Sequence, residues 1–574
     1  MAVCAAYVVV GGENITALTQ SYTCGSSSEP IIYETIGNYL DQVAERYPNT
    51  EALVVCHQDV RWTYSEFNDK VDDLAAGLLK LGINTGDRVG IWGPNSYEWV
   101  LTQMATAKIG AILVCVNPAY RLFELEYALN KSGRRAIVSA EQFKTSKYLE
   151  MLYKLAPELN SCAPGELKSE KLPELEIVIR MGDARSPGMF NFPDVCNTRD
   201  KTERARLEEL KSELRPDDAI NIQFTSGTTG SPKGATLTHC NILNNGYLTG
   251  EGLKLTPTDR LCIPVPLYHC FGMVLGNLAC FAHGATAVYP DEAFDPETTL
   301  RAVEAERCTG LHGVPTMFVA ELSHPEFDKF DLSTLRTGVM ASAPCPVDVM
   351  KRVISDMNMK HILIGYGQTE VSPINHLTLP EDPIEKRVET VGRAVPWVEI
   401  KLVGSDGRVV PIGERGEVCT RGYSVMLGYW NDEEQTKETI DDTRWLHSGD
   451  LGIMDDEGYL RIVGRIKDMI IRGGENVYPR KVEEFLYTHP AIAEVQVFGI
   501  PDPKMGEEVC AWIQVKEGET LAEDDLKSFC QGQITHFKIP KHIRFVSEYP
   551  MTVTGKIQKF KMSEIMVEEL ASVA

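Results

Sequence analysis

Short apolar runs alternate with segments of helical periodicity from about residue 35 to residue 390. Residues 88–92, 111–116 and 286–289 are examples of the apolar runs. Runs of this length predict buried strands, and strands that alternate with helices predict parallel sheets with helices on both faces. The region is long enough for two such sheets, so the pattern predicts an α/β fold.

The pattern changes between about residues 395 and 465. There the strand-like segments are separated by turns rich in Gly and Asp, such as 404–407 and 455–458. Strands joined by such turns predict a small antiparallel barrel or sheet.

A separate α+β unit is expected after residue 467. A helix is predicted near 480–488, with strands near 494–499 and 509–515. Earlier in the chain, the charged stretch 198–217 predicts a helical insertion or a surface connection.

The composition narrows the class of protein. A chain of 574 residues is too long for one hydrophobic core and should form two or more domains. Its net charge of -24 argues against a general nucleic-acid or anionic-membrane surface. None of the 15 cysteines forms a Cys-x-x-Cys pair, which favours reduced thiols over a disulfide framework or a zinc site. No apolar run approaches the roughly 20 residues that a membrane-spanning helix requires.

A loop dense in hydrogen-bond donors follows the apolar run 220–224 and precedes a helix-like segment. It consists of Thr225, Ser226, Gly227, Thr228, Thr229, Gly230, Ser231, Pro232, Lys233 and Gly234. Glycines let backbone amides approach a polyphosphate, hydroxyls add donors, and the lysine adds charge. The spacing differs from the Walker loop, because Lys233 is followed by Gly234 and not by Ser or Thr. We expect this loop to bind the phosphates of a triphosphate.

Two further polar clusters follow strand-like runs. In the segment 366–370, Thr369 could donate to a phosphate and Glu370 could hold a magnesium ion, although the turn of a helix N-terminus is an equal alternative. In 448–452, Asp450 suits a ribose diol, and a turn aspartate is the alternative.

The charged segment 464–479 contains Gly473 and Gly474 at a change in composition, where an interdomain linker is the alternative. Far downstream, Lys556 follows a glycine in a terminal loop, a position where a lysine is usually only solvated.

Together these segments resemble the adenylate-forming superfamily of acyl-CoA synthetases, adenylation domains and beetle luciferases. The resemblance covers about residues 35–565. The residues of 266–272 and 470–476 are most similar to those of animal medium-chain acyl-CoA synthetases, which work in mitochondria.

The resemblance implies three parts of the chain. These are an N-terminal extension (1–34), a large AMP-binding domain of two parallel-sheet subdomains and a small β-barrel (35–466), and a small mobile α+β lid (467–574).

The resemblance also implies roles for single residues. The loop from Thr225 to Lys233 would hold the β- and γ-phosphates of ATP, and Glu370 would bind Mg²⁺. Lys556 would bridge the substrate carboxylate and the α-phosphate, and Lys467 would be the hinge of the lid. The remaining positions implied for the ATP site are Ala343, Tyr366, Gln368, Thr369, Asp450 and Arg465.

Less is implied about the acyl and CoA sites. Gly473 and Gly474 would line the tunnel for the pantetheine arm of CoA. The residues implied for the acyl pocket are His269, Phe271, Gly272, Gly313 and Thr316. For His269, a hydrogen-bonded core histidine is the alternative.

The family's nucleotide-site tetrad often begins with glycine, whereas this chain has Ala341-Ser342.

The implied reaction activates a fatty acid, of medium chain length by resemblance, with ATP and Mg²⁺. Pyrophosphate leaves, and CoA then takes the acyl group from the acyl-adenylate and releases AMP. The alternatives are transfer to a carrier-protein thiol, a luciferase-like oxidase, and a catalytically silent nucleotide-binding protein. The expected partners are small molecules, without nucleic acid or a transmembrane segment, and the oligomeric state stays open.

The cellular location is implied only by the resemblance, which indicates mitochondria. The first 45 residues contain no Lys or Arg, so no Arg-rich presequence is visible, and a cytoplasmic location is the alternative.

Overall fold

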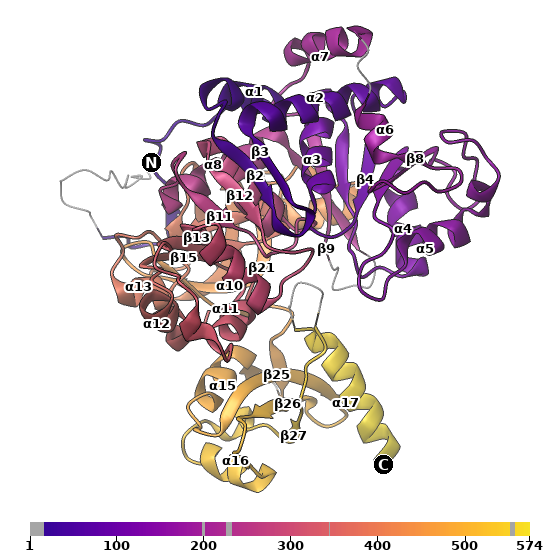
Figure 1. Ribbon diagram of the computed structural model, residues 1–574. Helices are drawn as coiled ribbons and strands as arrows, with labels where there is room; N and C mark the ends of the chain where they lie inside the picture. The colour runs from indigo at the N-terminus through magenta and orange to yellow at the C-terminus, as the bar shows by residue number, and fades with distance from the viewer. Residues whose placement is uncertain are drawn as a thin grey trace. The chain divides into compact units, whose positions relative to one another are not determined.

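A computed structural model describes residues 17–197, 201–225, 232–343, 345–473, 475–551 and 557–573 (Figure 1). The chain forms two compact units. Among the described residues, the first unit comprises 23–400 and 420–446, and the second comprises 17–22, 401–419 and the residues from 447 onward. The division implied at residues 466 and 467 stays a prediction.

The first unit contains an eight-stranded sheet in the order β20-β10-β9-β5-β4-β6-β7-β8. Strands β9, β5, β4, β6, β7 and β8 pair in parallel, as the alternation of apolar runs and helices predicts. The strands are β4 (Arg88–Trp92), β5 (Ile112–Cys115), β6 (Ala136–Ser139), β7 (Ile177–Arg180), β8 (Phe190–Asn191), β9 (Ala219–Thr225), β10 (Lys233–Thr238) and β20 (Gly428–Tyr429).

Helices follow most of these strands. Local sequence sets their ends: Ser96 caps the start of α3 with its side chain, and Gly110 ends that helix in the left-handed conformation at φ 70°. The helices in this part of the chain are α1 (Ile36–Arg46), α2 (Tyr64–Lys80), α3 (Tyr97–Ile109), α4 (Leu122–Ser132), α5 (Tyr148–Leu155), α6 (Phe192–Cys196), α7 (Lys201–Glu213) and α8 (His239–Leu253). The helix predicted in the charged stretch 198–217 is α7.

A nine-stranded sheet completes the first unit, in the order β17-β16-β15-β14-β13-β11-β12-β2-β3. Its central strands are parallel, and β3, β16 and β17 are antiparallel additions at the two edges. The strands are β2 (Glu51–Val55), β3 (Val60–Thr63), β11 (Arg260–Cys262), β12 (Thr286–Tyr289), β13 (Gly310–Leu311), β14 (Thr337–Met340), β15 (His361–Gly367), β16 (Ile374–Leu377) and β17 (Arg393–Ala394).

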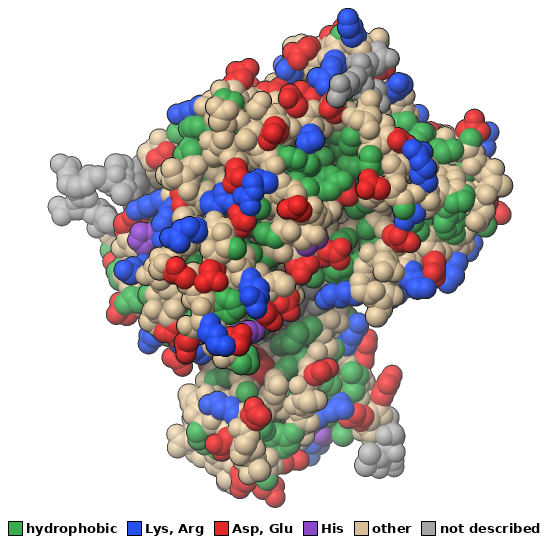
Figure 2. All heavy atoms as spheres, in the orientation of Figure 1, with side chains coloured by type: hydrophobic (Ala, Val, Ile, Leu, Met, Phe, Trp, Pro, Cys, Tyr) green, Lys and Arg blue, Asp and Glu red, His purple; other side chains and the backbone are tan. Residues whose placement is uncertain are grey.

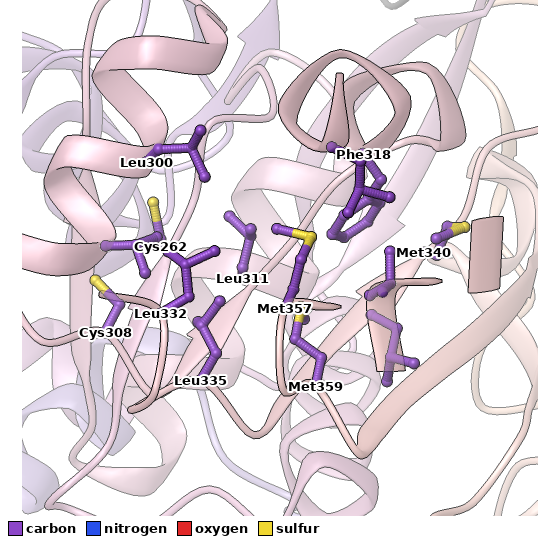
Figure 3. Packing of buried hydrophobic residues seen from close by; sticks show 14 of the residues in the cluster. Cys262, Leu300, Cys308, Leu311, Phe318, Leu332, Leu335, Met340, Met357 and Met359 are labelled. Carbon is purple, nitrogen blue, oxygen red and sulfur yellow. The ribbon is translucent and has the colours of Figure 1, made fainter. Parts of the chain in front are cut away.

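Buried side chains from helices and strands form the core beside this second sheet (Figure 3). Leu300 of α10 and Phe318 of α11 belong to one buried cluster with Leu311 of β13 and Met340 of β14. The helices of this part are α9 (Ala279–His283), α10 (Pro296–Ala305), α11 (Pro315–Leu322), α12 (Val347–Asp356), α13 (Ile384–Glu389) and α14 (Glu433–Thr439). Two largely parallel sheets with helices therefore form, with antiparallel strands at their edges, which confirms the predicted α/β class.

The second unit draws on a five-stranded sheet in the order β1-β18-β19-β21-β22. Its strands are β1 (Tyr22–Cys24), β18 (Val398–Val403), β19 (Arg415–Gly422), β21 (Leu446–Met454) and β22 (Leu460–Arg465). Strands β21 and β22 pair antiparallel, and most of the sheet lies where a small antiparallel barrel or sheet is expected, between residues 395 and 465.

The C-terminal part of the second unit has a sheet in the order β24-β23-β26-β25, with β27 paired to β26. The elements are β23 (Ile470–Arg472), β24 (Glu475–Val477), α15 (Pro479–Leu486), β25 (Ile492–Asp502), β26 (Gly506–Val515), α16 (Glu523–Cys530), β27 (His542–Phe545) and α17 (Lys559–Val573). The predicted helix and both predicted strands are present.

Charges of both signs lie close together on one face of the molecule. Figure 2 shows Lys and Arg side chains interspersed with Asp and Glu side chains on the visible face. Within the described ranges, no helix is both long enough and apolar enough to cross a membrane. No disulfide joins the cysteines of those ranges.

Candidate functional site

Three predicted segments lie at the carboxyl ends of neighbouring parallel strands in the nine-stranded sheet. We call this side, where the parallel strands end, the sheet edge. Strands β13, β14 and β15 are parallel neighbours, with Met340 opposite Ile364. Residues 312–316, 341–343 and 366–370 follow or end these strands, so they lie along the same edge. Ligands of open α/β sheets bind at this edge. Residue 344 lies outside the described residues.

Tyr366 lies near the end of β15, where strand pairing and a ring contact position it. Its ring lies 5.9 Å from the ring of His376 on the paired strand β16. Burial lowers the pKa of His376 to about 3, so this imidazole is neutral at pH 7. A side chain at Gly367 would place its first carbon 2.0 Å from the Pro373 carbonyl oxygen, so only glycine fits there.

The loop after β14 has an unusual backbone. Ser342 adopts φ 72°, the left-handed region that glycine favours. This is the Ala341-Ser342 position, where the resemblance implies a glycine. Ala341 is buried, whereas Ser342 and Ala343 are exposed at the edge of the sheet.

Thr369 and Glu370 lie in a short 3₁₀ turn, η5 (Thr369–Val371), and each is only 8% exposed. The Tyr429 hydroxyl donates a hydrogen bond of 2.8 Å to Glu370 Oε1. Burial and the neighbouring Glu370 carboxylate raise the pKa of Tyr429, so the phenol keeps its proton. The bond fixes one carboxylate oxygen of Glu370 at the sheet edge.

The predicted phosphate loop joins two strands. Strands β9 and β10 pair antiparallel, with Thr225 opposite Lys233. The expectation that a helix follows the loop directly is wrong, because Lys233–Thr238 pairs with β9 before α8 begins at His239. Pro232 is half-buried beside Lys233. The loop positions outside the described residues are Ser226, Gly227, Thr228, Thr229, Gly230 and Ser231.

Lys233 and Glu370 are connected through Tyr429. The Lys233 ammonium donates to Gln435 Oε1 at the start of α14 and lies 5.2 Å from the centre of the Tyr429 ring. The same tyrosine donates its hydroxyl to Glu370. Lys233 and Glu370 therefore both contact Tyr429, although Lys233 lies on β10 of one sheet and Glu370 follows β15 of the other.

Sequence reasoning missed Tyr429 and Gln435. Tyr429 lies on the two-residue strand β20, which pairs with β10 through Ala235. The only local signal was a tyrosine beside a glycine, which is common in turns. The pairing of β20 with β10 gives the tyrosine its place beside Lys233.

In the second unit, Asp450 and Arg465 lie opposite each other on β21 and β22. Arg465 Nε donates to Asp450 Oδ1 at 2.7 Å, and the Asp450 side chain is only 6% exposed. The Ser448 hydroxyl accepts a hydrogen bond from the Asp450 amide. The two residues predicted to bind ribose are thus brought together.

The remaining predicted positions of the second unit are partly described. Lys467 follows β22, and Gly473 turns the chain between β23 and β24 at φ 59°. Gly474 and Lys556 lie outside the described residues. Met551 and Ile557, which flank 552–556, form an antiparallel bridge.

The predicted acyl-pocket residues adjoin a π-helix, η3 (Phe271–Leu278), that contains Phe271 and Gly272. π-Helical turns are frequent at functional sites. His269 precedes it and accepts a hydrogen bond from the Phe271 amide at Nδ1. Gly313 bridges to Met340, and Thr316 is exposed on α11.

His312 joins these pocket elements and was missed. Its Nε2 is 2.9 Å from the Leu275 carbonyl of the π-helix, and its Nδ1 accepts from the Val339 amide of β14. Its ring centre lies 5.3 Å from that of Phe271. Burial lowers the pKa of His312 to about 4, so the neutral ring can donate at Nε2 and accept at Nδ1.

Known proteins resemble this chain over nearly its full length. The Bacillus subtilis (strain 168) protein YngI, named as an acyl-CoA synthetase, is 50% identical over 539 residues, covering 94% of this chain and 98% of its own. The mitochondrial medium-chain acyl-CoA ligase ACSF2 of Danio rerio is 48% identical over 560 residues, covering 97% and 92%.

Solved structures agree. The anthranilate CoA ligase AuaEII in complex with anthranoyl-AMP has a TM-score of 0.79 at 27% identity, covering 94% of this chain and 98% of its own. A fatty acyl CoA synthetase of Mycobacterium tuberculosis has a TM-score of 0.70 at 28% identity, covering 92% and 98%.

The family profiles span both parts of the chain. The AMP-binding enzyme profile matches residues 40–430, and the profile of the AMP-binding enzyme C-terminal domain matches 481–556. The first match alone covers more than half of the 574 residues. The chain belongs to the AMP-binding enzyme family.

Proposed function

We propose that this chain is an AMP-forming acyl-CoA ligase that activates a fatty acid with ATP and transfers the acyl group to CoA. The observation that carries the proposal is the near full-length similarity to proteins named as acyl-CoA synthetases and ligases. A medium-chain acid is the proposed substrate, because the relative from Danio rerio is named for it.

In the first step, a carboxylate oxygen of the acid attacks the α-phosphorus of ATP. The bond between this phosphorus and the oxygen that bridges to the β-phosphate breaks, and pyrophosphate leaves. Because both reactants are anions, positive charge and donors are needed near the phosphates. Lys233 supplies an ammonium group, and Thr369 supplies a hydroxyl donor beside Glu370.

In the second step, the sulfur of CoA attacks the acyl carbon of the acyl-adenylate. A thioester bond forms, the bond to AMP breaks, and the thiol proton passes to solvent. A free thiol has a pKa of about 8.5, so a thiolate fraction exists near neutral pH. We propose that Gly473 and Gly474 line the approach of the pantetheine arm.

Glu370 fits the role of a Mg²⁺ ligand. Its Oε1 accepts from Tyr429, which leaves Oε2 for a hard cation that prefers oxygen. When bound, Mg²⁺ would neutralise phosphate charge and polarise the phosphorus–oxygen bonds. The chain's own contribution is to hold the Glu370 carboxylate in one orientation through Tyr429.

Asp450 is proposed to bind the ribose hydroxyls, with Arg465 beside it. Lys556 is proposed to bridge the substrate carboxylate and the α-phosphate, and Lys467 to act as the hinge between the two steps. A mitochondrial location is proposed from the ACSF2 relatives, with the cytoplasm as the alternative because one relative is bacterial.

A pyrophosphate-release assay with fatty acids of increasing length tests the proposal. We expect ATP-dependent pyrophosphate release, with a maximum at medium chain length, and AMP formation that requires free CoA. Acyl-adenylate formation with no turnover of free CoA would favour a carrier-protein acceptor. No pyrophosphate release with any acid tested would contradict the enzyme proposal.

A further inference from the structure

Three side chains with metal-binding atoms meet on neighbouring strands of the second unit. Glu417 and Cys419 lie two residues apart on β19, so both point to the same face, and His447 lies on the adjacent strand β21. One ligand atom from each residue lies within 4.8 Å of the others. None of the proposed catalytic or nucleotide-binding roles uses these residues.

The contacts converge on one nitrogen. His447 Nδ1 is 2.9 Å from Glu417 Oε2 and 3.5 Å from Cys419 Sγ. In a Cys–His–acid relay, the acid holds the imidazole nitrogen opposite the thiol. Here the acid and the thiol approach the same nitrogen, so the three groups point toward a common centre and do not form a relay.

The spacing suits tetrahedral Zn²⁺. Bonds of about 2.0–2.3 Å in this geometry separate neighbouring ligand atoms by roughly 3.3–3.7 Å. The observed separations of 2.9 and 3.5 Å need only small side-chain adjustments to reach that range. Thiolate, imidazole and carboxylate are the three ligand types that Zn²⁺ takes in proteins.

Burial is uneven around the centre. Cys419 is fully buried, whereas the side chains of Glu417 and His447 are 19% and 34% exposed. The centre is therefore dry on the thiol side and accessible on the other side. A metal ion can enter from solvent and keep one water ligand.

We propose that Glu417, Cys419 and His447 form a Zn²⁺-binding site on the sheet of the second unit, with a fourth position open to water. Binding requires both the Cys419 thiol and His447 Nδ1, which donates to Glu417, to lose their protons to solvent, and the thiolate, the imidazole nitrogen and a carboxylate oxygen then bond to the metal. The absence of Cys-x-x-Cys pairs does not exclude such a site, because its ligands come from two strands.

Hydrogen bonds connect the proposed metal site to the backbone of β21 next to Asp450. Glu417 Oε1 accepts from the Gly449 amide at 3.0 Å, and the Ser448 hydroxyl donates to the Val418 carbonyl at 2.7 Å. Metal binding through Glu417 Oε2 leaves the Oε1 contact in place. Zn²⁺ should therefore stiffen residues 447–450 and raise the thermal unfolding temperature without displacing Asp450.

Metal titration of the metal-stripped full chain tests the proposal, with Co²⁺ as a spectroscopic substitute for Zn²⁺. We expect one equivalent of Co²⁺ to give a thiolate-to-metal charge-transfer band that one equivalent of Zn²⁺ removes. Cys419→Ser should abolish the band, and His447→Gln and Glu417→Gln should each weaken Co²⁺ binding at least tenfold. Cys56→Ser, which alters an exposed thiol of the first unit, should keep the band.

X-ray absorption at the zinc edge provides a measurement that needs no variant. We expect one sulfur at about 2.3 Å together with nitrogen and oxygen ligands at about 2.0–2.2 Å. A spectrum without sulfur, a Co²⁺ band that persists in Cys419→Ser, or no stoichiometric binding would overturn the proposal.

Discussion

The pair Lys233 and Glu370 in the first unit and the pair Asp450 and Arg465 in the second unit differ in how their charged groups are held. In the first unit, Lys233 and Glu370 each contact a neutral side chain, Tyr429, and not each other. In the second unit, Asp450 and Arg465 contact each other directly at 2.7 Å. Separated charges remain able to bind an anion and a cation, whereas a direct ion pair mainly fixes the orientation of its members. The first arrangement suits phosphate and Mg²⁺, and the second suits an oriented hydrogen bond to a ribose.

The largest expected effect tests the separated arrangement. Lys233→Met removes the ammonium group proposed to face the phosphates, so kcat/KM for ATP should fall about 10²–10³-fold. Pyrophosphate release at varied ATP concentration measures it. Lys437→Met is the matched control, because Lys437 lies on α14 with its side chain 80% exposed, and it should leave kcat/KM unchanged. Equal activity of both variants would show that Lys233 does not contact the phosphates.

Substitutions at Tyr429 can separate the contribution of its hydroxyl from that of its ring. Tyr429→Phe keeps the ring near Lys233 but removes the donor to Glu370, and we expect kcat/KM to fall about tenfold, the equivalent of about 1.4 kcal/mol. Tyr429→Leu also removes the ring and should lose more. Activity measured across Mg²⁺ concentrations should show the Phe variant needing more Mg²⁺. A Phe variant equal to the native enzyme would mean that the hydroxyl does not orient Glu370.

The direct ion pair predicts a stability effect. Arg465→Gln leaves the buried Asp450 carboxylate without this partner and should lower the free energy of unfolding by about 1–2 kcal/mol, less than for a fully buried pair because Arg465 is 42% exposed. Urea unfolding measures it. In a double-mutant cycle, Asp450→Asn should remove most of the extra loss. Strictly additive losses would contradict the pairing.

The last prediction concerns His312, which joins the π-helix to β14 and affects stability only at acidic pH. Its folded pKa is about 4 and its ordinary value is 6.5, so below pH 6.5 the unfolded chain binds a proton that the folded chain lacks. Its contribution to stability is therefore lost as the pH falls from 6.5 toward 4, by up to about 1.4 kcal/mol per pH unit. His312→Gln should reduce the slope of unfolding free energy against pH by up to one proton. Parallel slopes for the two proteins would refute this assignment.

Much of the fold follows from local pattern. The runs 88–92 and 111–116 became β4 and β5, because a buried parallel strand needs apolar residues on both faces. The charged stretch 198–217 contains α7, whose Leu207 and Leu210 are buried while most of its other residues are charged. The helix expected directly after the phosphate loop was wrong, because pairing with β9 outweighed local helical pattern in Lys233–Thr238.

Some features of the candidate site also follow from the sequence, and others depend on tertiary contacts. The sequence by itself determined the α/β class, the strand that precedes the predicted phosphate loop and the order of the polar segments, because these depend on neighbours in the chain. Only the tertiary structure placed Tyr429 between Lys233 and Glu370, and His312 between the π-helix and β14. It also brought Cys419 to His447, 28 positions away, and Lys233 to Gln435, 202 positions away. Strand pairing and burial decide such contacts, and local periodicity reports which residues are buried but not which strands will meet.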